Sequence, residues 1–261
     1  MRRLLGAAIA LMLAMTGGAL AQRPKESVEA DASTRQVAIT SSFTGTEILV
    51  FGTVENSVQP SPEAGTYDII VVVEGEPEPA VVRKKSRVAG IWINTSSMRF
   101  DAVPSYYAIA STRPIDEIAG NVLLDAKQIG FDHILMAPSG ADAADAAAVE
   151  SFKQALIRLK EEHGVYVNKD FGVTFIGRSL FRATISLPPN VPVGPLTARV
   201  YLFKEGKLLG QYESRVGLQR EGIERFLHNF AISQPLAYGV VTVLLAAAAG
   251  LGAAYAFRKP A

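Results

Sequence analysis

Cysteine is absent from the 261 residues of this chain. Its absence excludes disulfides, thiol redox chemistry and thiolate metal sites, so an exported domain with this sequence is stabilised by packing alone. Histidine is scarce too: His133, His163 and His228 lie far apart and match none of the short spacings that bind zinc. We therefore expect neither a metal nor another cofactor.

The sequence also lacks the motifs that mark common catalytic sites. It contains no Gly-x-Ser-x-Gly nucleophile motif and no glycine loop of the type that cradles phosphate. The carboxylates Asp142 and Asp145 lie on an alanine-rich stretch, where we expect them to face solvent. These absences favour a protein that is not an enzyme. An envelope hydrolase or carbohydrate-active enzyme stays open as an alternative, suggested only by export and by the size of the domain.

A strong excess of either charge is missing as well. The 26 basic and 25 acidic residues leave a formal net charge of +1. Domains that bind nucleic acid usually carry a clear positive excess, so we expect no nucleic-acid partner.

What the chain does contain is one long apolar run near its carboxyl end. The run from Leu236 to Phe257 has no charged side chain and is followed by Arg258-Lys259. As a helix of about 22 residues it measures roughly 33 Å, which matches a hydrocarbon core of about 30 Å. The run predicts a transmembrane helix over residues 235–257 with a cytoplasmic tail over 258–261, and the lipid bilayer as a partner.

The amino end predicts export. Arg2-Arg3, the apolar stretch Leu4 to Met15 and the small-residue pattern Ala19-Leu20-Ala21 are the three parts of a secretory signal, which we assign to residues 1–21. Removal of this signal leaves the bulk of the chain in the periplasm. The basic tail then lies inside, as the positive-inside rule requires of a single-pass inner-membrane protein.

Between the two ends, short β-branched and aromatic runs predict a mainly β protein with an Ig-like β-sandwich architecture. The apolar run Tyr67 to Val73 predicts a central strand, and the basic run Val81 to Arg87 an edge strand. We assign the following regions: 22–34, flexible lead; 35–112, first β-sandwich region; 113–164, helical section; 165–219, second β region; 220–234, amphipathic juxtamembrane helix.

Within the helical section, the pattern predicts helices over 115–128 and 141–163, the second with an apolar stripe of Phe152, Leu156 and Leu159. The two β regions show a weak similarity, with residues 43–49 aligning to 175–181. This similarity leaves two architectures open: a duplication of two sandwich units, or one sandwich built from both halves.

The segment from Arg83 to Tyr107 is the best candidate for a binding surface. Arginine and lysine side chains hold oxyanions or acidic partners, and aromatic rings supply rigid contact area. The candidate residues for anion or partner binding are Arg83, Lys84, Lys85, Arg87, Trp92, Tyr106 and Tyr107. The alternative is structural, because basic residues protect a strand edge and Trp and Tyr are common in sandwich cores.

Small residues recur at helical spacing in the predicted anchor. They form one row of Ala246, Gly250 and Ala254 and another that includes Ala248 and Gly252. Such rows let a second helix approach closely, so we expect a helix-docking surface for an integral membrane transporter.

Several motifs together resemble a known family, the uncharacterised alphaproteobacterial transmembrane proteins called Alph_Pro_TM. The resemblance rests on Ser42 to Glu47 with Phe51-Gly52, Arg83-Lys84-Lys85 through Gly90 to Asn94, Val103 to Tyr107, and Leu180 to Ala183 through Leu187 to Pro192. It implies a membrane location and, as a partner, a TauE/SafE-like anion exporter, but no activity.

Taken with the topology, the pattern favours a membrane-anchored periplasmic accessory or binding protein. A passive structural or adhesion module of the envelope is a further alternative.

Overall fold

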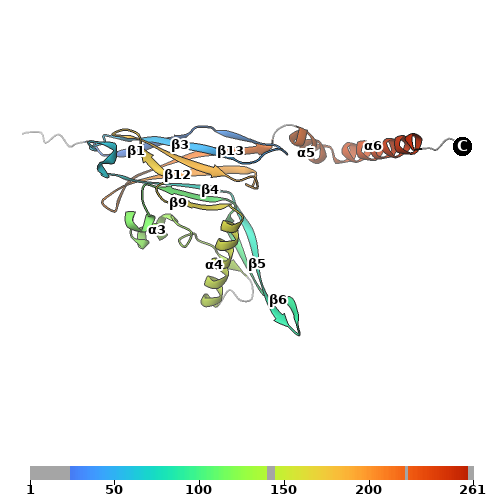
Figure 1. The fold of residues 1–261 in the computed structure, drawn as a ribbon, viewed down its shortest axis with the longest axis horizontal. Helices are drawn as coiled ribbons and strands as arrows, with labels where there is room; N and C mark the ends of the chain where they lie inside the picture. Colours follow the sequence, from blue (N-terminus) through green and yellow to red (C-terminus); the bar gives the residue numbers. More distant parts are fainter. Residues whose placement is uncertain (1–23, 140–144, 221–222, 258–261) are drawn as a thin grey trace, which may run out of the picture.

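The computed structural model describes residues 24–139, 145–220 and 223–257 (Figure 1). The predicted signal peptide, the cytoplasmic tail and Asp142 lie outside the described residues. The described part is mainly β, with three sheets, a helical section and a carboxyl-terminal apolar helix, as the sequence predicts.

The first sheet has four antiparallel strands in the order β1-β3-β11-β10. Side chains along these strands alternate between core and solvent: in β3, Ile48, Val50 and Val54 are buried while their neighbours are not. The strands are β1 (Ser27–Ala32), β3 (Thr46–Glu55), β10 (Val173–Phe175) and β11 (Leu180–Leu187).

Strand β1 overturns part of one prediction. Residues 22–34 were expected to form a flexible lead, yet Ser27–Ala32 pairs with β3 along its whole length. The physical reason is that Val28, Ala30 and Ala32 alternate with polar residues and bury their side chains in the core.

The second sheet has six strands in the order β2-β13-β12-β4-β7-β9. Strand β4 lies between β12 and β7, and Ile69 to Val73 are fully buried on both of its faces, so the predicted central strand is confirmed. The strands are β2 (Gln36–Ile39), β4 (Asp68–Gly75), β7 (Tyr107–Ser111), β9 (Tyr166–Lys169), β12 (Gly194–Lys204) and β13 (Lys207–Arg220).

The two β regions form one sandwich. Strand β3 of the first half pairs with β11 of the second, and β4 pairs with β12. The order of the inner strands is also symmetric, since exchanging β3 with β11, β4 with β12 and β7 with β13 restores the same pairings among these six strands. This symmetry is the pattern that a duplication produces, although the two copies pair with each other rather than stand apart.

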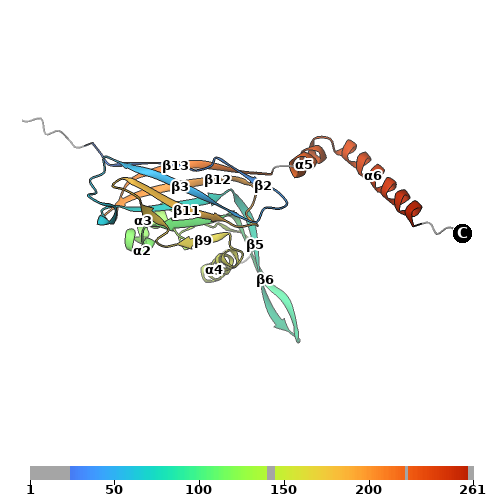
Figure 2. The ribbon, with the colours of Figure 1, turned by 45° about the horizontal axis from the view of Figure 1, so that its top comes forward.

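The helical section contains α2 (Ile115–Ile118), α3 (Asn121–Lys127) and α4 (Ala146–Glu162); a short 3-10 turn, η1 (Pro62–Ala64), lies elsewhere. Helices α2 and α3 lie on the outer side of the second sheet, near β9, and α4 extends away from the sheets beside β5 (Pro77–Val88) (Figures 1 and 2). The helix predicted over 115–128 is interrupted, because Ala119 is extended and Gly120 opens α3. The helix predicted from 141 begins at Ala146, where the Asp145 carboxylate accepts hydrogen bonds from the amides of Ala147 and Ala148.

A third, small sheet contains a long hairpin. It is formed by β5 (Pro77–Val88) and β6 (Ile91–Pro104), with β8 (Pro138–Ser139) beside β6. The edge strand predicted from Val81 to Arg87 is part of the longer β5. Strands β5 and β6 join through Ala89-Gly90, whose φ values of 50° and 88° make the tight turn that two antiparallel strands need.

Two helices follow the sandwich: α5 (Ile223–Ser233) and α6 (Pro235–Ala256). Helix α6 has a mean hydropathy of 2.0 and none of it is buried, so it is long and apolar enough to cross a membrane. In α5, Phe226 is 66% exposed and its ring stacks on Phe230, which in turn meets Tyr238 of α6. The sandwich therefore leaves an apolar face of α5 uncovered.

Candidate functional site

The structure separates the seven candidate binding residues into two groups. Tyr106 and Tyr107 lie in the interior, 0% and 1% exposed, on opposite faces of the second sheet. The Tyr106 hydroxyl donates to the Ser186 carbonyl at 2.9 Å, and that of Tyr107 donates to the Gln128 carbonyl at 2.7 Å. Burial raises the pKa of both hydroxyls, which therefore stay protonated as donors. These two tyrosines join the layers of the fold and do not reach the hairpin surface.

The other candidates lie on the hairpin. Arg83, Lys84, Lys85 and Arg87 project from β5, and all four are exposed. Trp92 lies opposite Arg87 near the tip and is 68% exposed, which contradicts the alternative that it is a core residue. Strand β5 pairs only with β6, so the predicted basic edge strand is confirmed.

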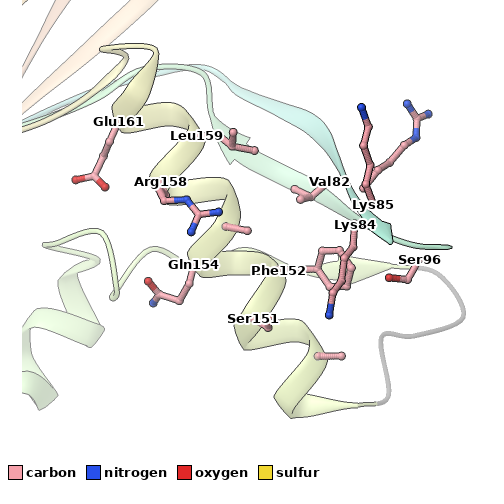
Figure 3. A pocket seen from close by; sticks show the side chains of 13 residues that line it. Val82, Lys84, Lys85, Ser96, Ser151, Phe152, Gln154, Arg158, Leu159 and Glu161 are labelled. Carbon is pink, nitrogen blue, oxygen red and sulfur yellow. The ribbon is translucent and has the colours of Figure 1, made fainter. Parts of the chain in front are cut away.

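A groove of about 1160 Å³ separates the basic strand from α4 (Figure 3). Four consecutive residues of β5, from Val82 to Lys85, line it. Ser96 of β6, which pairs with Lys84, lines it as well. The groove therefore lies over one face of the hairpin and extends to the outer edge of β5. The opposite wall is a face of α4 that includes Phe152, Gln154, Arg158, Leu159 and Glu161.

The groove carries more positive than negative charge. Arg83, Lys84, Lys85 and Arg158 line it, against the carboxylate of Glu161. Among the ion pairs of the described residues, none includes Arg83, Lys84 or Lys85; Arg158 approaches Glu162 at 3.9 Å, with both side chains exposed. An exposed pair at this distance is weak, so Arg158 stays available to a ligand. Lys84 points toward α4 and Lys85 points away from it (Figure 3), so Lys84 and Arg158 are directed into the groove while Arg83 and Lys85 lie at its rim.

Near the base of the hairpin, a further lysine is already occupied. The Lys160 ammonium donates to Glu78 at 3.0 Å and lies 5.9 Å from the centre of the Tyr166 ring. These contacts tie α4 to the start of β5 and hold the two groove walls at a set separation. Lys160 is therefore a structural residue and not a groove cation.

Sequence reasoning missed the helical wall of the groove. The stripe on α4 was assigned to packing, and Phe152 and Leu156 are indeed buried. Leu159, however, is 40% exposed and lines the groove together with Arg158. Leu159 shared the apolar stripe with the buried residues, and no local pattern places it beside β5.

The remaining polar clusters are small. A cavity of about 190 Å³ beside α2 is lined by Asp116, Asp132, His133 and Asp170, and the His133 ring forms a 2.6 Å contact with Asp125. Within the described ranges, no group of three or more His, Cys, Asp or Glu side chains is arranged to hold a metal ion.

The small-residue rows of the anchor are open. A Cβ added at Gly250 or Gly252 would meet no atom within 4 Å beyond the helix itself. Ala246, Ala248 and Ala254 lie on the same exposed helix. The rows are therefore accessible to another helix in the plane of the membrane.

Comparison with solved structures finds distant likenesses. The chain matches Spo0M, a sporulation control protein from Bacillus subtilis, with a TM-score of 0.29 and 10% identity over 80% of this chain and 55% of that one. It thus spans about half the length of that protein. It matches BslA, a bacterial hydrophobin, with a TM-score of 0.22 and 10% identity over 76% of this chain and 99% of the other.

Sequence comparison is more decisive. A search of curated proteins gives no significant match. A family model described as "Putative transmembrane protein (Alph_Pro_TM)" matches residues 27–259, which include both halves of the sandwich, the hairpin, α5 and α6. The chain therefore belongs to the Alph_Pro_TM family of transmembrane proteins.

Proposed function

We propose that this protein is a non-catalytic accessory subunit, anchored in the inner membrane, that binds an acidic segment of a partner protein on its periplasmic side. The observation that carries the proposal is the groove between β5 and α4, where the cations Arg83, Lys84 and Lys85 lack ion-pair partners among the described residues. Such a groove attracts carboxylates, and its open strand edge selects for an extended backbone.

Strand addition explains why a groove of this shape is useful. Among the described residues no strand pairs with the outer edge of β5, which presents the backbone amides and carbonyls of alternate residues after Pro79. An extended partner segment can satisfy these groups as a further strand while its acidic side chains meet the lysines and arginines. The apolar side chains Val82, Phe152 and Leu159 supply contact area between the charges.

Charge reversal in the groove tests this function. The probe is a fluorescent peptide of alternating Glu and Thr, added to the full chain in nanodiscs of zwitterionic lipid. We expect Arg83→Glu with Lys84→Glu and Lys85→Glu to weaken binding by about tenfold or more, because like charges then face the peptide. The binding of the unaltered protein should also weaken as salt is raised.

A matched variant separates the groove from net charge. Arg35→Glu with Lys207→Glu and Arg215→Glu makes the same change in charge at exposed positions away from the groove. An equal loss in both variants would contradict a localised site. A peptide methylated at alternate amide nitrogens keeps its charge but cannot add as a strand, so undiminished binding of that peptide would rule out strand addition alone.

The partner we favour is an integral membrane transporter of the TauE/SafE-like anion-exporter kind, docked against α6. Support comes from the accessible rows around Gly250 and Gly252. Gly250→Leu should lower copurification of the transporter in mild detergent several-fold, whereas Leu251→Ile, a conservative change on the same helix, should leave it unchanged. Recovery of no membrane protein with the unaltered chain would count against the partnership.

A further inference from the structure

The tip of the β5–β6 hairpin exposes a cluster of large apolar side chains. Val88, Ile91, Trp92 and Ile93 are between 41% and 68% exposed. Cross-strand pairing places Val88 opposite Ile91 on one face, which Ile93 shares, while Trp92 and Arg87 lie opposite each other on the other face. An aliphatic face backed by a tryptophan and basic residues is amphipathic, and nothing in the described part of the chain covers it.

The hairpin leaves the sandwich at the same end as the membrane anchor. Strands β4 and β13 are both antiparallel to β12, so they run in the same direction. Gly75 at the end of β4 is opposite Leu196, and Leu196 is opposite Val216 near the end of β13. The chain enters β5 two residues after Gly75 and heads for α5 after Arg220, and in both ribbon views the two exits are on one side (Figures 1 and 2).

The lengths of the elements then bring the tip to the bilayer. From Arg220 to Ile223 the chain has three peptide steps, at most about 11 Å. Helix α5, whose exposed apolar face suits the interface, adds little height when it lies flat. Strand β5, with 12 residues, extends roughly 40 Å from the sandwich. An arm of this length, starting near the interface on the membrane-facing side, reaches the lipid.

We propose that the hairpin tip inserts into the same bilayer that holds α6, with Val88, Ile91 and Ile93 among the acyl chains, Trp92 at the interface, and Lys85 and Arg87 on anionic headgroups. Tryptophan prefers this depth, and basic residues beside an apolar tip are attracted to the negative surface of anionic lipid. The hairpin is then a second membrane contact besides α6, and it holds the groove between β5 and α4 at a fixed height above the membrane.

The chain contains a single tryptophan, so its own fluorescence reports the tip. The full chain is reconstituted into vesicles of phosphatidylcholine and phosphatidylglycerol, with and without bromine on the acyl chains. We expect brominated lipid to remove about half or more of the Trp92 emission, and aqueous acrylamide to quench it weakly. Replacing phosphatidylglycerol by phosphatidylcholine, or Arg87→Glu, which leaves the groove lining unaltered, should lower the ratio of inserted to free tip by about tenfold.

A matched control moves the tryptophan to the other end of the sandwich. Phe171 is 67% exposed and follows β9, which runs away from the membrane-facing end because it is parallel to β7. In Trp92→Phe with Phe171→Trp, brominated lipid should leave the emission unchanged. Ile91 and Ile93 are exposed and do not contribute to the core, so replacing them should not disturb folding. Ile91→Ser with Ile93→Ser should weaken insertion of the tip and restore acrylamide quenching of Trp92.

Two results would overturn the proposal. One is a Trp92 that acrylamide quenches freely while bromine does not. The other is a shift of the Trp92 emission that depends on the protein-to-lipid ratio while brominated lipid does not quench this emission. That result would mean that the tip contacts a second copy of the chain. Because these readouts use no groove ligand, they are independent of the result obtained with the acidic peptide.

Discussion

Leu244→Arg combined with Leu245→Arg is expected to release the protein from the membrane. Both leucines lie at the middle of α6 and are exposed, 63% and 66%, to whatever surrounds that helix. An arginine at the centre of a spanning helix costs about 2.5–3.5 kcal/mol on insertion scales, so two of them outweigh the favourable contribution of the remaining apolar residues near the centre. After alkaline carbonate washing of membranes, the variant should move from the pellet to the supernatant.

The control for this experiment keeps the helix apolar. Leu244→Ile with Leu245→Ile should stay in the washed pellet at the level of the unaltered chain, because isoleucine inserts as readily as leucine. If the arginine variant remained fully resistant to carbonate, α6 would not be the element that fixes the chain in the bilayer.

Gly52→Ala is the second change with a large expected effect, this time on folding. Gly52 lies in β3 between Ala30 of β1 and Phe181 of β11. A Cβ at this position would lie 2.3 Å from the Glu29 carbonyl oxygen and 2.6 Å from the Phe181 ring. The carbonyl belongs to the backbone of a paired strand and cannot rotate away, so we expect a loss of about 3 kcal/mol in the free energy of unfolding. Thermal unfolding of the purified full chain, followed by circular dichroism, measures it.

Gly177→Ala is the matched control, since an added Cβ there meets no atom within 4 Å. Its midpoint should differ little from that of the unaltered protein. A Gly52→Ala chain that unfolded at the same temperature as Gly177→Ala would mean that β1 does not pack against β3 as described.

Hydrophobic pattern was enough to predict the anchor and most strands. The apolar runs of α6 and β4 can be recognised from consecutive residues alone. A membrane, or a sheet covered on both faces, requires apolar side chains at every position. The hairpin was harder. The edge strand predicted from Val81 to Arg87 was shorter than β5, because polar residues on a strand that lies away from the core give little alternation.

The candidate site could be predicted only in part. The basic strand was visible as a run of four cations, but the Tyr106 and Tyr107 pair was grouped with it by nearness in sequence. Strand alternation and the turn of the chain after Pro104 carry both tyrosines into the core. Arg158 was missed for the opposite reason, since it reaches the groove from a helix more than 70 residues away along the chain. Long-range placement of this kind has no local signature.

The pairing of the central strands delays folding of the nascent chain. The innermost pairs of both sheets, β3 with β11 and β4 with β12, join residues more than 100 positions apart. A nascent chain that ends at Ser111 therefore contains β3 and β4 but not yet their partners β11 and β12. Contacts this distant in sequence make folding slow, and a half-made sandwich exposes edges that invite aggregation. Folding thus waits for β11 and β12, and β12 ends at Lys204, about 30 residues before α6 begins, so the two sheets can close only shortly before the anchor follows.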